Sequence, residues 1–198
     1  MSTDDRRQHI LAAAERLLRH YGAAKTTMVE IAREAAIGVG TVYLEFPSKE
    51  AIIEDLARHK HERILGAMRG AADAKGSYAA RLRMMIDAKV DVIFTLADEG
   101  AHAPELLHCM RPAVQASEQR FRDEELHLIA ELLRSGAEAG EFEITESRRT
   151  ASVFLRAYAS FWPPAVFHQP REIVKPALQA MHELVLRGLL SRKPSKRK

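Results

Sequence analysis

Residues 27–49 read TMVEIAREAAIGVGTVYLEFPSK and predict two short helices separated by a tight break. Thr27 and Glu30 have the spacing of a capping box, which places the first helix at about 28–35. The second helix is predicted at 39–45, because the Phe-Pro-Ser sequence that follows cannot continue it. Two short helices joined in this way form a helix-turn-helix, whose second helix is narrow enough for the major groove of DNA.

Side chains around this motif fit contacts with DNA. Small residues at the start of the second helix let its backbone approach base edges, and hydroxyl and ammonium donors are placed to reach phosphate oxygens. Lys49 also stands at the start of the next helix, where the helix dipole favours an anion. Val39 has no hydrogen-bonding group and is expected to contact a thymine methyl. The predicted DNA-contacting residues are Thr27, Gly38, Val39, Gly40, Thr41, Tyr43, Leu44 and Lys49.

The rest of the chain also has helical periodicity, and no segment alternates like a β-strand with hairpin turns. We therefore predict an all-α protein of about nine helices. Outside the motif, helices are expected at about 6–20, at about 49–69, at 77–97, from Pro104, from Pro112 to 135–140, from a Thr145 cap to Trp162, and at 172–190 with Pro176 in the first turn.

The composition is that of an ordinary globular protein. The 198 residues, 46% hydrophobic and 29% charged, suffice for one large domain or two small ones. The absence of an 18-residue apolar run argues against a transmembrane helix, and the polar N-terminus argues against a signal peptide. The single cysteine, Cys109, excludes a disulfide framework and a cysteine-based zinc site within the chain. We expect a cytoplasmic protein with no cofactor, no structural metal and no membrane partner.

The net charge does not by itself predict DNA binding. Thirty Lys and Arg residues against 27 Asp and Glu residues give a net charge of +3. Five of the basic residues lie in segment 192–198, which has no acidic residue, so residues 1–191 carry a net charge of −2. The argument for DNA binding therefore depends on where side chains lie, and the basic segment is interpreted as a solvated, flexible tail.

The helix-turn-helix and its flanks resemble the TetR family of bacterial repressors. The similarity covers about the first quarter of the chain and includes Ile10-Leu11-Ala12-Ala13-Ala14, Gly22, Thr26-Thr27, Ile31-Ala32, Ala35, Gly40-Thr41-Val42-Tyr43 and Phe46-Pro47-Ser48-Lys49-Glu50. A weaker similarity at 136–142, GAEAGEF, matches the junction before the family's eighth helix. Nine helices is also the usual number in this family.

The resemblance implies a role for each matching residue. Val39 corresponds to the main base-reading position, and Gly40 and Thr41 correspond to positions at the edge of the DNA. Phosphate contacts are implied for Thr27, Tyr43 and Lys49. The internal core of the motif is implied for Ile31, Ala32, Val42 and Phe46.

Three positions depart from the family pattern. Gly38 stands where Ser is common as a helix cap, and Ala36 stands where Gly is common in the turn, so the turn either lacks glycine or uses Gly38. Glu45 stands where Tyr or His is usual near the DNA backbone. A carboxylate there would repel phosphate unless it accepts from cytosine N4 or turns away, and a solvated surface acid is the favoured interpretation.

The resemblance also implies a dimeric repressor of a pseudo-palindromic operator on double-stranded DNA, with a helix-turn-helix domain at 1–50 and a ligand-binding and dimerisation domain at 51–191. Met and aromatic residues favour a small, mainly apolar effector, and the near-neutral to acidic charge of residues 1–191 favours a neutral or cationic one. The resemblance favours an effector that releases the repressor from DNA. The predicted pocket residues are Met85, Phe94, His102, His108, Met110, Phe121, Tyr158 and Trp162. Apolar stripes predict a dimer interface at Val153, Ala157, Phe161, Val174, Leu178, Met181, Val185 and Leu189.

Other functions compete with this one. Glu105 with His108 and Glu124 with His127 have the Glu-x-x-His spacing of di-iron helical bundles, which also need two further Glu residues. A single metal at His102, His108 and Cys109 is a related alternative. The third alternative is a TetR-like regulator controlled by a partner protein, which a well-sealed core without a pocket would favour.

Overall fold

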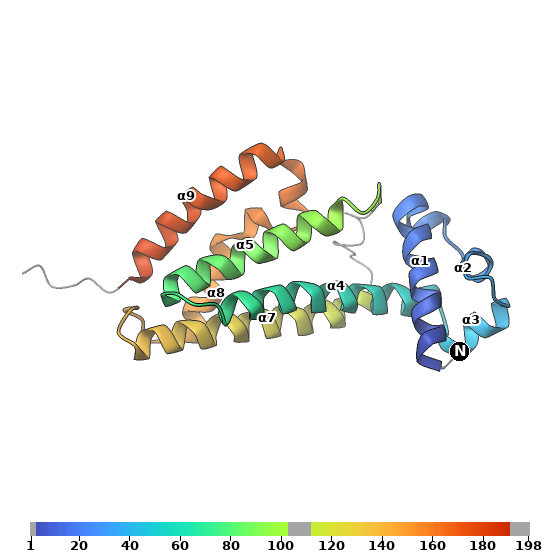
Figure 1. Ribbon diagram of the computed structural model, residues 1–198, viewed down its shortest axis with the longest axis horizontal. Coiled ribbons are helices and arrows are strands. Elements are labelled where there is room, and N and C mark those ends of the chain that lie inside the picture. Colours follow the sequence, from blue (N-terminus) through green and yellow to red (C-terminus); the bar gives the residue numbers. More distant parts are fainter. Residues whose placement is uncertain (1–2, 103–111, 191–198) are drawn as a thin grey trace, which may run out of the picture. The chain divides into compact units, whose positions relative to one another are not determined.

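Figure 1 shows the computed structural model of the chain, which describes residues 3–102 and 112–190. Within these ranges the backbone forms eight α-helices, two short 3₁₀ helices and no β-strand, which confirms the predicted all-α class. The chain divides into two compact units, Met1–Arg63 with Ile93–Phe121 and Ile64–Val92 with Arg122–Lys198. The predicted domain boundary after residue 50 falls inside the first unit. The helix expected from Pro104 lies outside the described residues.

The first helix, α1, spans Thr3–Lys25 and is interrupted at Gly22. The φ of Gly22 is 76°, in the left-handed region that glycine adopts without a steric cost. A Cβ atom at this position would also lie 3.1 Å from Nδ1 of His102. The residues after Gly22 are helical again, which is why α1 ends later than the predicted end at His20.

The second helix, α2, spans Met28–Glu34 and begins with the predicted capping box. The amide of Glu30 donates to Oγ1 of Thr27 over 3.3 Å, and the amide of Thr27 donates to Oε2 of Glu30 over 2.7 Å. Two amides that lack a partner inside the helix are thereby satisfied.

The turn after α2 contains no glycine in a left-handed conformation. Ala36 takes the positive φ, 51°, and Gly38 is extended. Gly38 is the N-cap of α3, Val39–Glu45, and makes no capping hydrogen bond through a side chain. The turn therefore does without glycine at the position where the family commonly has it, at the cost of a strained Ala36.

Helices α1, α2 and α3 and the first part of α4, which begins at Lys49, close around one hydrophobic core. Its residues are Ile10, Leu11, Ala14, Leu18, Met28, Ile31, Ala32, Val42, Phe46, Ile52, Ile53, Leu56 and Ala57. This set contains all four residues that the resemblance places in the core of the motif.

The longer helices follow the predicted pattern. α4 spans Lys49–Ala72, α5 spans Tyr78–Ala97 and α7 spans Pro112–Glu138. The predicted caps Ser48 and Ser77 each accept a hydrogen bond of 3.2 Å from the amide three residues later. No helix within 3–102 or 112–190 combines the length and the apolar character needed to cross a bilayer.

Near the C-terminus three details of the prediction were wrong. α8 spans Ser147–Ala157 and is capped at Glu146 rather than Thr145. It ends before the predicted Trp162, and the 3₁₀ helices η1, Ala159–Phe161, and η2, Ala165–His168, lie on either side of the Pro163–Pro164 pair. α9 spans Arg171–Leu189 with Pro170 as its N-cap, so Pro176 lies beyond the first turn.

The GAEAGEF segment joins α7 to α5 within the second unit. The Glu141 carboxylate accepts from the amides of Tyr78 and Ala79, over 2.9 and 2.8 Å, and so caps the start of α5. Gly136 packs against Phe142, because a Cβ atom on it would come within 2.4 Å of that ring. The segment therefore has a structural role, which depends on Gly136 and Glu141.

Candidate nucleic-acid interface and ligand site

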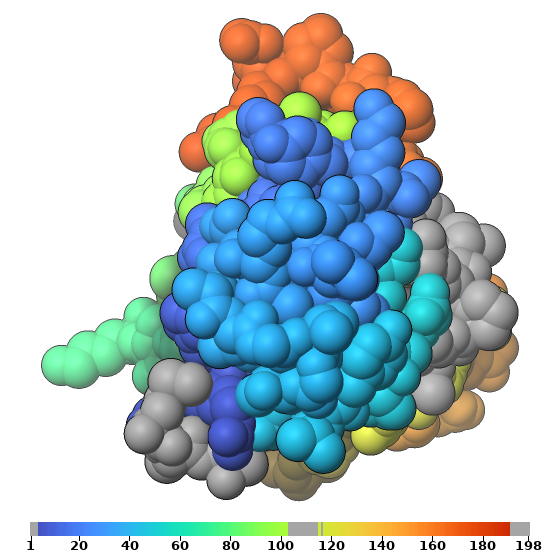
Figure 2. Space-filling view, turned by 90° about the vertical axis from the view of Figure 1, so that its right-hand side faces the viewer, coloured from blue at the N-terminus to red at the C-terminus, as the bar shows by residue number. Residues whose placement is uncertain are grey.

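Helix α3 has one buried side and one exposed side. Val42 is fully buried, whereas Leu44 is 86% exposed and Val39, Tyr43 and Gly40 are also exposed. Figure 2 looks onto this unit, with α2 in mid-blue and α3 in lighter blue at its surface. Three large exposed side chains, Val39, Tyr43 and Leu44, gather on this short helix, which is typical of an interaction surface such as a helix that inserts into a DNA groove. Base contacts by Val39, Gly40, Thr41 and Leu44 stay a prediction.

The predicted phosphate contacts at Thr27 and Lys49 also have structural roles. Oγ1 of Thr27 belongs to the capping box and also donates to Oε2 of Glu30 over 2.9 Å. Nζ of Lys49 donates to the carbonyl oxygens of Ala23 and Thr26 over 2.7 and 2.8 Å. An ammonium group has three protons, and these two bonds use two of them. Phosphate binding by Lys49, Thr27 and Tyr43 stays a prediction.

The Glu45 side chain is largely buried and paired with a residue of α1. Its carboxylate accepts from Nε of Arg6 over 2.7 Å, and only a tenth of its side chain is exposed. The favoured interpretation from the sequence, a solvated acid, was therefore wrong, because α1 supplies a cationic partner. The opposite charge of Arg6 offsets the repulsion that the carboxylate would exert on phosphate.

The second unit contains a buried ion pair that the sequence analysis missed. Lys89 of α5 and Glu125 of α7 form an ion pair, and both side chains are almost fully buried. Nζ of Lys89 also lies 3.7 Å from the ring centre of Trp162. Burial lowers the pKa of Lys89, and Glu125 opposes this shift by favouring the charged ammonium. The available signal was Lys89 itself, which occupies the same helical stripe as the buried Leu82, Ile86 and Ile93.

A chain of hydrogen bonds that begins at the buried Tyr158 lies in the same unit. The hydroxyl of Tyr158 lies 2.8 Å from Nδ1 of His182, and Nε2 of His182 lies 3.0 Å from Oδ1 of Asp87. Burial, with a smaller contribution from Asp87, raises the pKa of Tyr158 well above its ordinary value. The hydroxyl therefore stays protonated, and the three groups link α8, α9 and α5.

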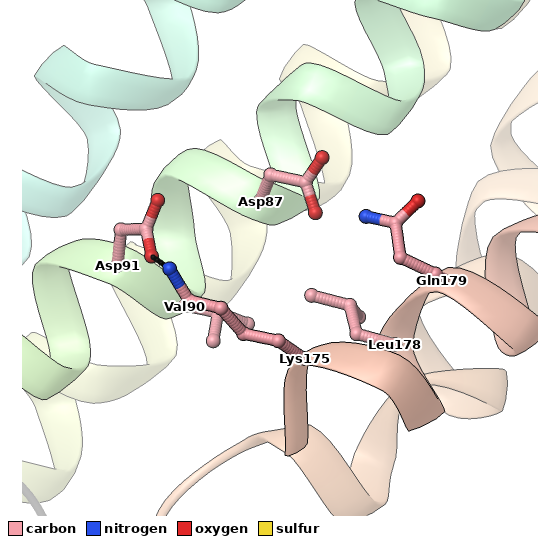
Figure 3. Close-up of a pocket in the computed structure, with 6 residues that line it drawn as sticks. All are labelled: Asp87, Val90, Asp91, Lys175, Leu178 and Gln179. Carbon is pink, nitrogen blue, oxygen red and sulfur yellow. Dashed lines mark ion pairs between the residues drawn. The ribbon is translucent and has the colours of Figure 1, made fainter. Parts of the chain in front are cut away.

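One pocket of the second unit lies between α5 and α9 and has a volume of about 230 Å³. Figure 3 shows its lining, with Asp87, Val90 and Asp91 from α5 and Lys175, Leu178 and Gln179 from α9. Lys175 pairs with Asp91 over 3.4 Å at the edge of this pocket. None of the predicted effector-pocket residues within 3–102 and 112–190 lines it.

The residues predicted for the effector pocket are distributed over both units. Phe94, His102 and Phe121 belong to the first unit, and Met85, Tyr158 and Trp162 belong to the second. Phe121 stacks on His61 with 4.4 Å between the ring centres, and the backbone amide of His102 donates to the Arg19 carbonyl. Met85 and Tyr158 are fully buried, so a ligand reaches them only if the surrounding helices separate. His108 and Met110 lie outside the described residues.

The residues predicted at the dimer interface differ in how far they are buried. Phe161, Val174 and Leu178 are buried within the chain, so for these three residues the prediction is corrected to core. Ala157, Met181, Val185 and Leu189 are half-buried, and Val153 is exposed. The large apolar residues exposed on α9 are instead Ile173 and Leu184, the latter 72% exposed. The exposed apolar side chains of α9 therefore lie on a different face of the helix from the residues predicted at the dimer interface.

The structure does not favour a metal site at the Glu-x-x-His pair that it describes. Glu124 is exposed and pairs with Arg69 over 3.0 Å, and His127 is exposed on α7. These side chains therefore do not point into a helical bundle, as a di-iron site would require. Within 3–102 and 112–190 no three His, Cys, Asp or Glu side chains are grouped to hold a metal. Glu105, His108 and Cys109 lie outside the described residues.

Both parts of the chain match models of known families. Residues 10–56 match the model described as bacterial regulatory proteins, tetR family, and residues 79–184 match the tetracyclin repressor-like C-terminal domain. An HTH-type transcriptional regulator of Haemophilus influenzae is 26% identical over 81 residues, which cover 41% of this chain and 43% of that protein. The match therefore spans less than half of this curated relative.

Solved structures share the fold over nearly the whole chain. A protein from Shewanella sp. PV-4, described as a tetR family transcription regulator, is 26% identical with a TM-score of 0.64, over 94% of this chain and 99% of that one. A TetR/AcrR family regulator from Thermobifida fusca is 19% identical with a TM-score of 0.72, over 98% and 100%. A transcriptional regulator from Saccharomonospora viridis, solved with choline, is 17% identical with a TM-score of 0.71, over 96% and 100%.

Proposed function

The chain belongs to the TetR family of transcriptional regulators, which act through a DNA-binding helix-turn-helix rather than by catalysis, and we propose that it is a dimeric, ligand-responsive repressor. The observation that carries the proposal is α3, whose buried Val42 anchors it while Val39, Tyr43 and Leu44 face outward. A two-fold dimer presents two such helices, so the operator is a pseudo-palindrome with half-sites about one helical turn apart, roughly 34–36 Å.

The proposed dimer interface uses α8 and α9. Ile173 and Leu184 on α9 and Val153 on α8 are exposed apolar side chains, and a two-fold interface would remove them from water. The half-buried Ala157, Met181, Val185 and Leu189 of the predicted stripe remain part of this proposal.

The proposed effector is a small, mainly apolar molecule, neutral or cationic. A face of Trp162 and the carboxylate of Glu125 already hold one cation, the ammonium of Lys89. Aromatic faces next to a carboxylate are the chemistry that recognises organic ammonium ions, and the fold relative from Saccharomonospora viridis was solved with choline. We place the effector near Trp162, so that binding would require the helices around Met85 and Tyr158 to separate.

The burial of Met85 and Tyr158 favours a second candidate, a regulator of the same family that is controlled by a partner protein. Full burial of these two side chains leaves no opening for a small molecule at their position in the predicted pocket, whereas a protein partner needs only an outer surface.

The two candidates differ in their response to small molecules. Choline and a set of apolar neutral compounds would be screened for thermal shift and for release of bound DNA, in wild type and in Trp162→Ala. The proposal expects at least one compound that releases DNA from wild type and has a weaker effect on the variant. Release that is equal in both proteins would place the effector elsewhere, and the absence of any active compound would favour the partner protein.

A further inference from the structure

Helix α3 is short and buries little of its own surface. It is seven residues long, its N-cap Gly38 makes no side-chain hydrogen bond, and Val42 is its one fully buried residue. Helices of this length are not stable alone, so tertiary contacts must set the orientation of α3. Base recognition depends on that orientation, because a tilt of the recognition helix moves all of its base-contacting side chains at once.

Arg7 of α1 connects the end of α3 to α4. Its Nη1 donates to the backbone carbonyl of Glu45 over 2.9 Å, at the C-terminus of α3, where a cation also complements the helix dipole. Its Nε and Nη2 donate to Oδ2 of Asp55 on α4, over 3.1 and 2.8 Å. Its guanidinium carbon lies 4.0 Å from the ring centre of Phe46, the residue that ends α3.

Burial and a second arginine fix the Asp55 carboxylate in position for its contact with Arg7. Only 7% of its side chain is exposed, and Arg58 on the next turn of α4 pairs with its other oxygen, Oδ1. Burial alone would raise the pKa of Asp55, but the hydrogen bonds from Arg58 and Arg7 outweigh it and lower the pKa. Asp55 is therefore a fixed carboxylate that anchors Arg7 to α4.

Arg6 adds a second connection at the same end of α3. Its Nε donates to the side chain of Glu45, whereas Arg7 binds the backbone of the same residue. Two adjacent arginines of α1 thus hold one residue of α3 by its side chain and by its main chain. The pattern explains why an acid stands at position 45, where the family usually has Tyr or His.

We propose that Arg6 and Arg7 are positioning residues for DNA recognition, which set the orientation of α3 through Glu45 and Asp55 and do not themselves contact DNA. The inference rests on DNA binding by the helix-turn-helix. It makes Glu45 a structural partner of α1 rather than a base-reading residue. Removing either member of the Arg6–Glu45 pair should then have the same effect on DNA binding.

The test compares Arg6→Gln, Glu45→Gln, the double variant and the exchanged pair Arg6→Glu with Glu45→Arg. Each full-length protein binds a duplex that wild type has enriched from a random library, and an unselected duplex, at several KCl concentrations, with fluorescence anisotropy as the readout. Circular dichroism and thermal melting show that each variant is folded. Arg16→Gln is the matched control, because Arg16 makes a similar but exposed ion pair of 2.8 Å from α1 to Glu34 of α2.

We expect each single variant to bind the enriched duplex about tenfold more weakly, and the double variant to bind no worse than the weaker single one. The exchanged pair should recover most of the affinity, and the dependence of log Kd on log salt should be unchanged in Arg6→Gln. Arg7→Lys, which keeps the charge but loses the planar fork, should weaken binding similarly. Arg16→Gln should bind as wild type does.

Other results would overturn the inference. If Arg6 contacts phosphate, Arg6→Gln lowers the salt slope by about 0.9, and Glu45→Gln binds as well as wild type or better, because a negative charge near DNA is gone. Equal binding by wild type and all variants would show that the pair does not position α3. Failure of wild type to bind any duplex would instead refute DNA binding itself.

Discussion

The ammonium of Lys89 lies 3.7 Å from the ring centre of Trp162, the one tryptophan of the chain, and is paired with the buried carboxylate of Glu125. Moving two charges out of water is costly. This cost is offset because the two opposite charges attract each other and because the Lys89 ammonium packs on an aromatic face. The loss of stability is therefore expected to differ between removal of one partner and removal of both. Loss of one partner leaves the other charge buried alone, whereas loss of both need not destabilise the fold.

The first prediction tests this asymmetry. Glu125→Gln should lower the free energy of unfolding by about 3–5 kcal/mol, and Lys89→Met with Glu125→Leu should recover most of that loss. Urea denaturation followed by the fluorescence of Trp162 measures both. Glu124→Gln is the control, because Glu124 is exposed and its pair with Arg69 should contribute at most about 1 kcal/mol. Equal losses in Glu125→Gln and Glu124→Gln would contradict the prediction.

The second prediction concerns Lys60 of α4, which is buried among Glu15, Arg19, Arg63 and Glu99. Burial lowers its pKa to about 8, although Glu15 and Glu99 raise it. Between pH 8 and the ordinary value of 10.5 the unfolded chain therefore keeps a proton that the folded chain has lost. This raises the stability of the fold as the pH increases through that window, and the buried charge destabilises the fold below it.

Lys60→Met should accordingly be more stable than wild type at pH 7, by up to about 3 kcal/mol, with a difference that shrinks towards pH 10.5. Urea denaturation at several pH values measures the difference. Lys75→Met, at an exposed position, is the control and should follow wild type throughout. A difference that is constant from pH 7 to pH 10.5 would show that Lys60 titrates with an ordinary pKa.

The third prediction separates two roles of Lys49. Lys49→Ala removes a charged donor from the carbonyl oxygens of Ala23 and Thr26, which should lower the stability by about 1–3 kcal/mol. If the third proton of the ammonium binds phosphate as well, the affinity falls for all duplexes alike and the salt slope decreases by about 0.9. Thermal melting and anisotropy titrations at several salt concentrations measure the two effects. An unchanged slope would restrict Lys49 to the structural role.

The fourth prediction concerns the dimer. Leu184→Glu places a charge on the exposed stripe of α9 and should give monomers, because an interface there would have to bury the carboxylate. Sedimentation equilibrium at micromolar concentration gives the molecular mass. Ala139→Glu, at an exposed position in the turn after α7, is the control and should keep the wild-type mass. A wild-type protein that is monomeric under these conditions would refute the proposed dimer.

The sequence predicted the first unit in more detail than the second, for a physical reason. Local signals determine the helix-turn-helix, since the capping box at Thr27 and the proline at Pro47 each act within a few residues. The bounds of α3 and the core positions of the motif were predicted for the same reason. The partner of Glu45 was missed because Arg6 is distant in the chain, and no local pattern connects the two.

The second unit depends on contacts between distant residues. An apolar stripe shows that a helix face is buried, but it does not show whether the chain itself or a second copy buries it. Val174 and Leu178 were therefore predicted at the dimer interface although they lie in the core. Similarly, Met and aromatic residues predicted an effector pocket, but the sequence does not show that Met85 and Tyr158 are fully buried. The pair of Lys89 and Glu125 was missed because no local pattern connects two charges on different helices, although Lys89 lies in the apolar stripe of α5.

The most direct test of the account is selection of duplexes from a random library by the wild-type protein and by Val39→Ala, followed by sequencing and anisotropy. We predict that wild type enriches an inverted repeat with half-sites about one helical turn apart, and that Val39→Ala relaxes the preference for thymine at one position in each half-site. A selection that enriches no inverted repeat, or a Val39→Ala protein with the wild-type preference, would contradict the assignment of α3 as the recognition helix.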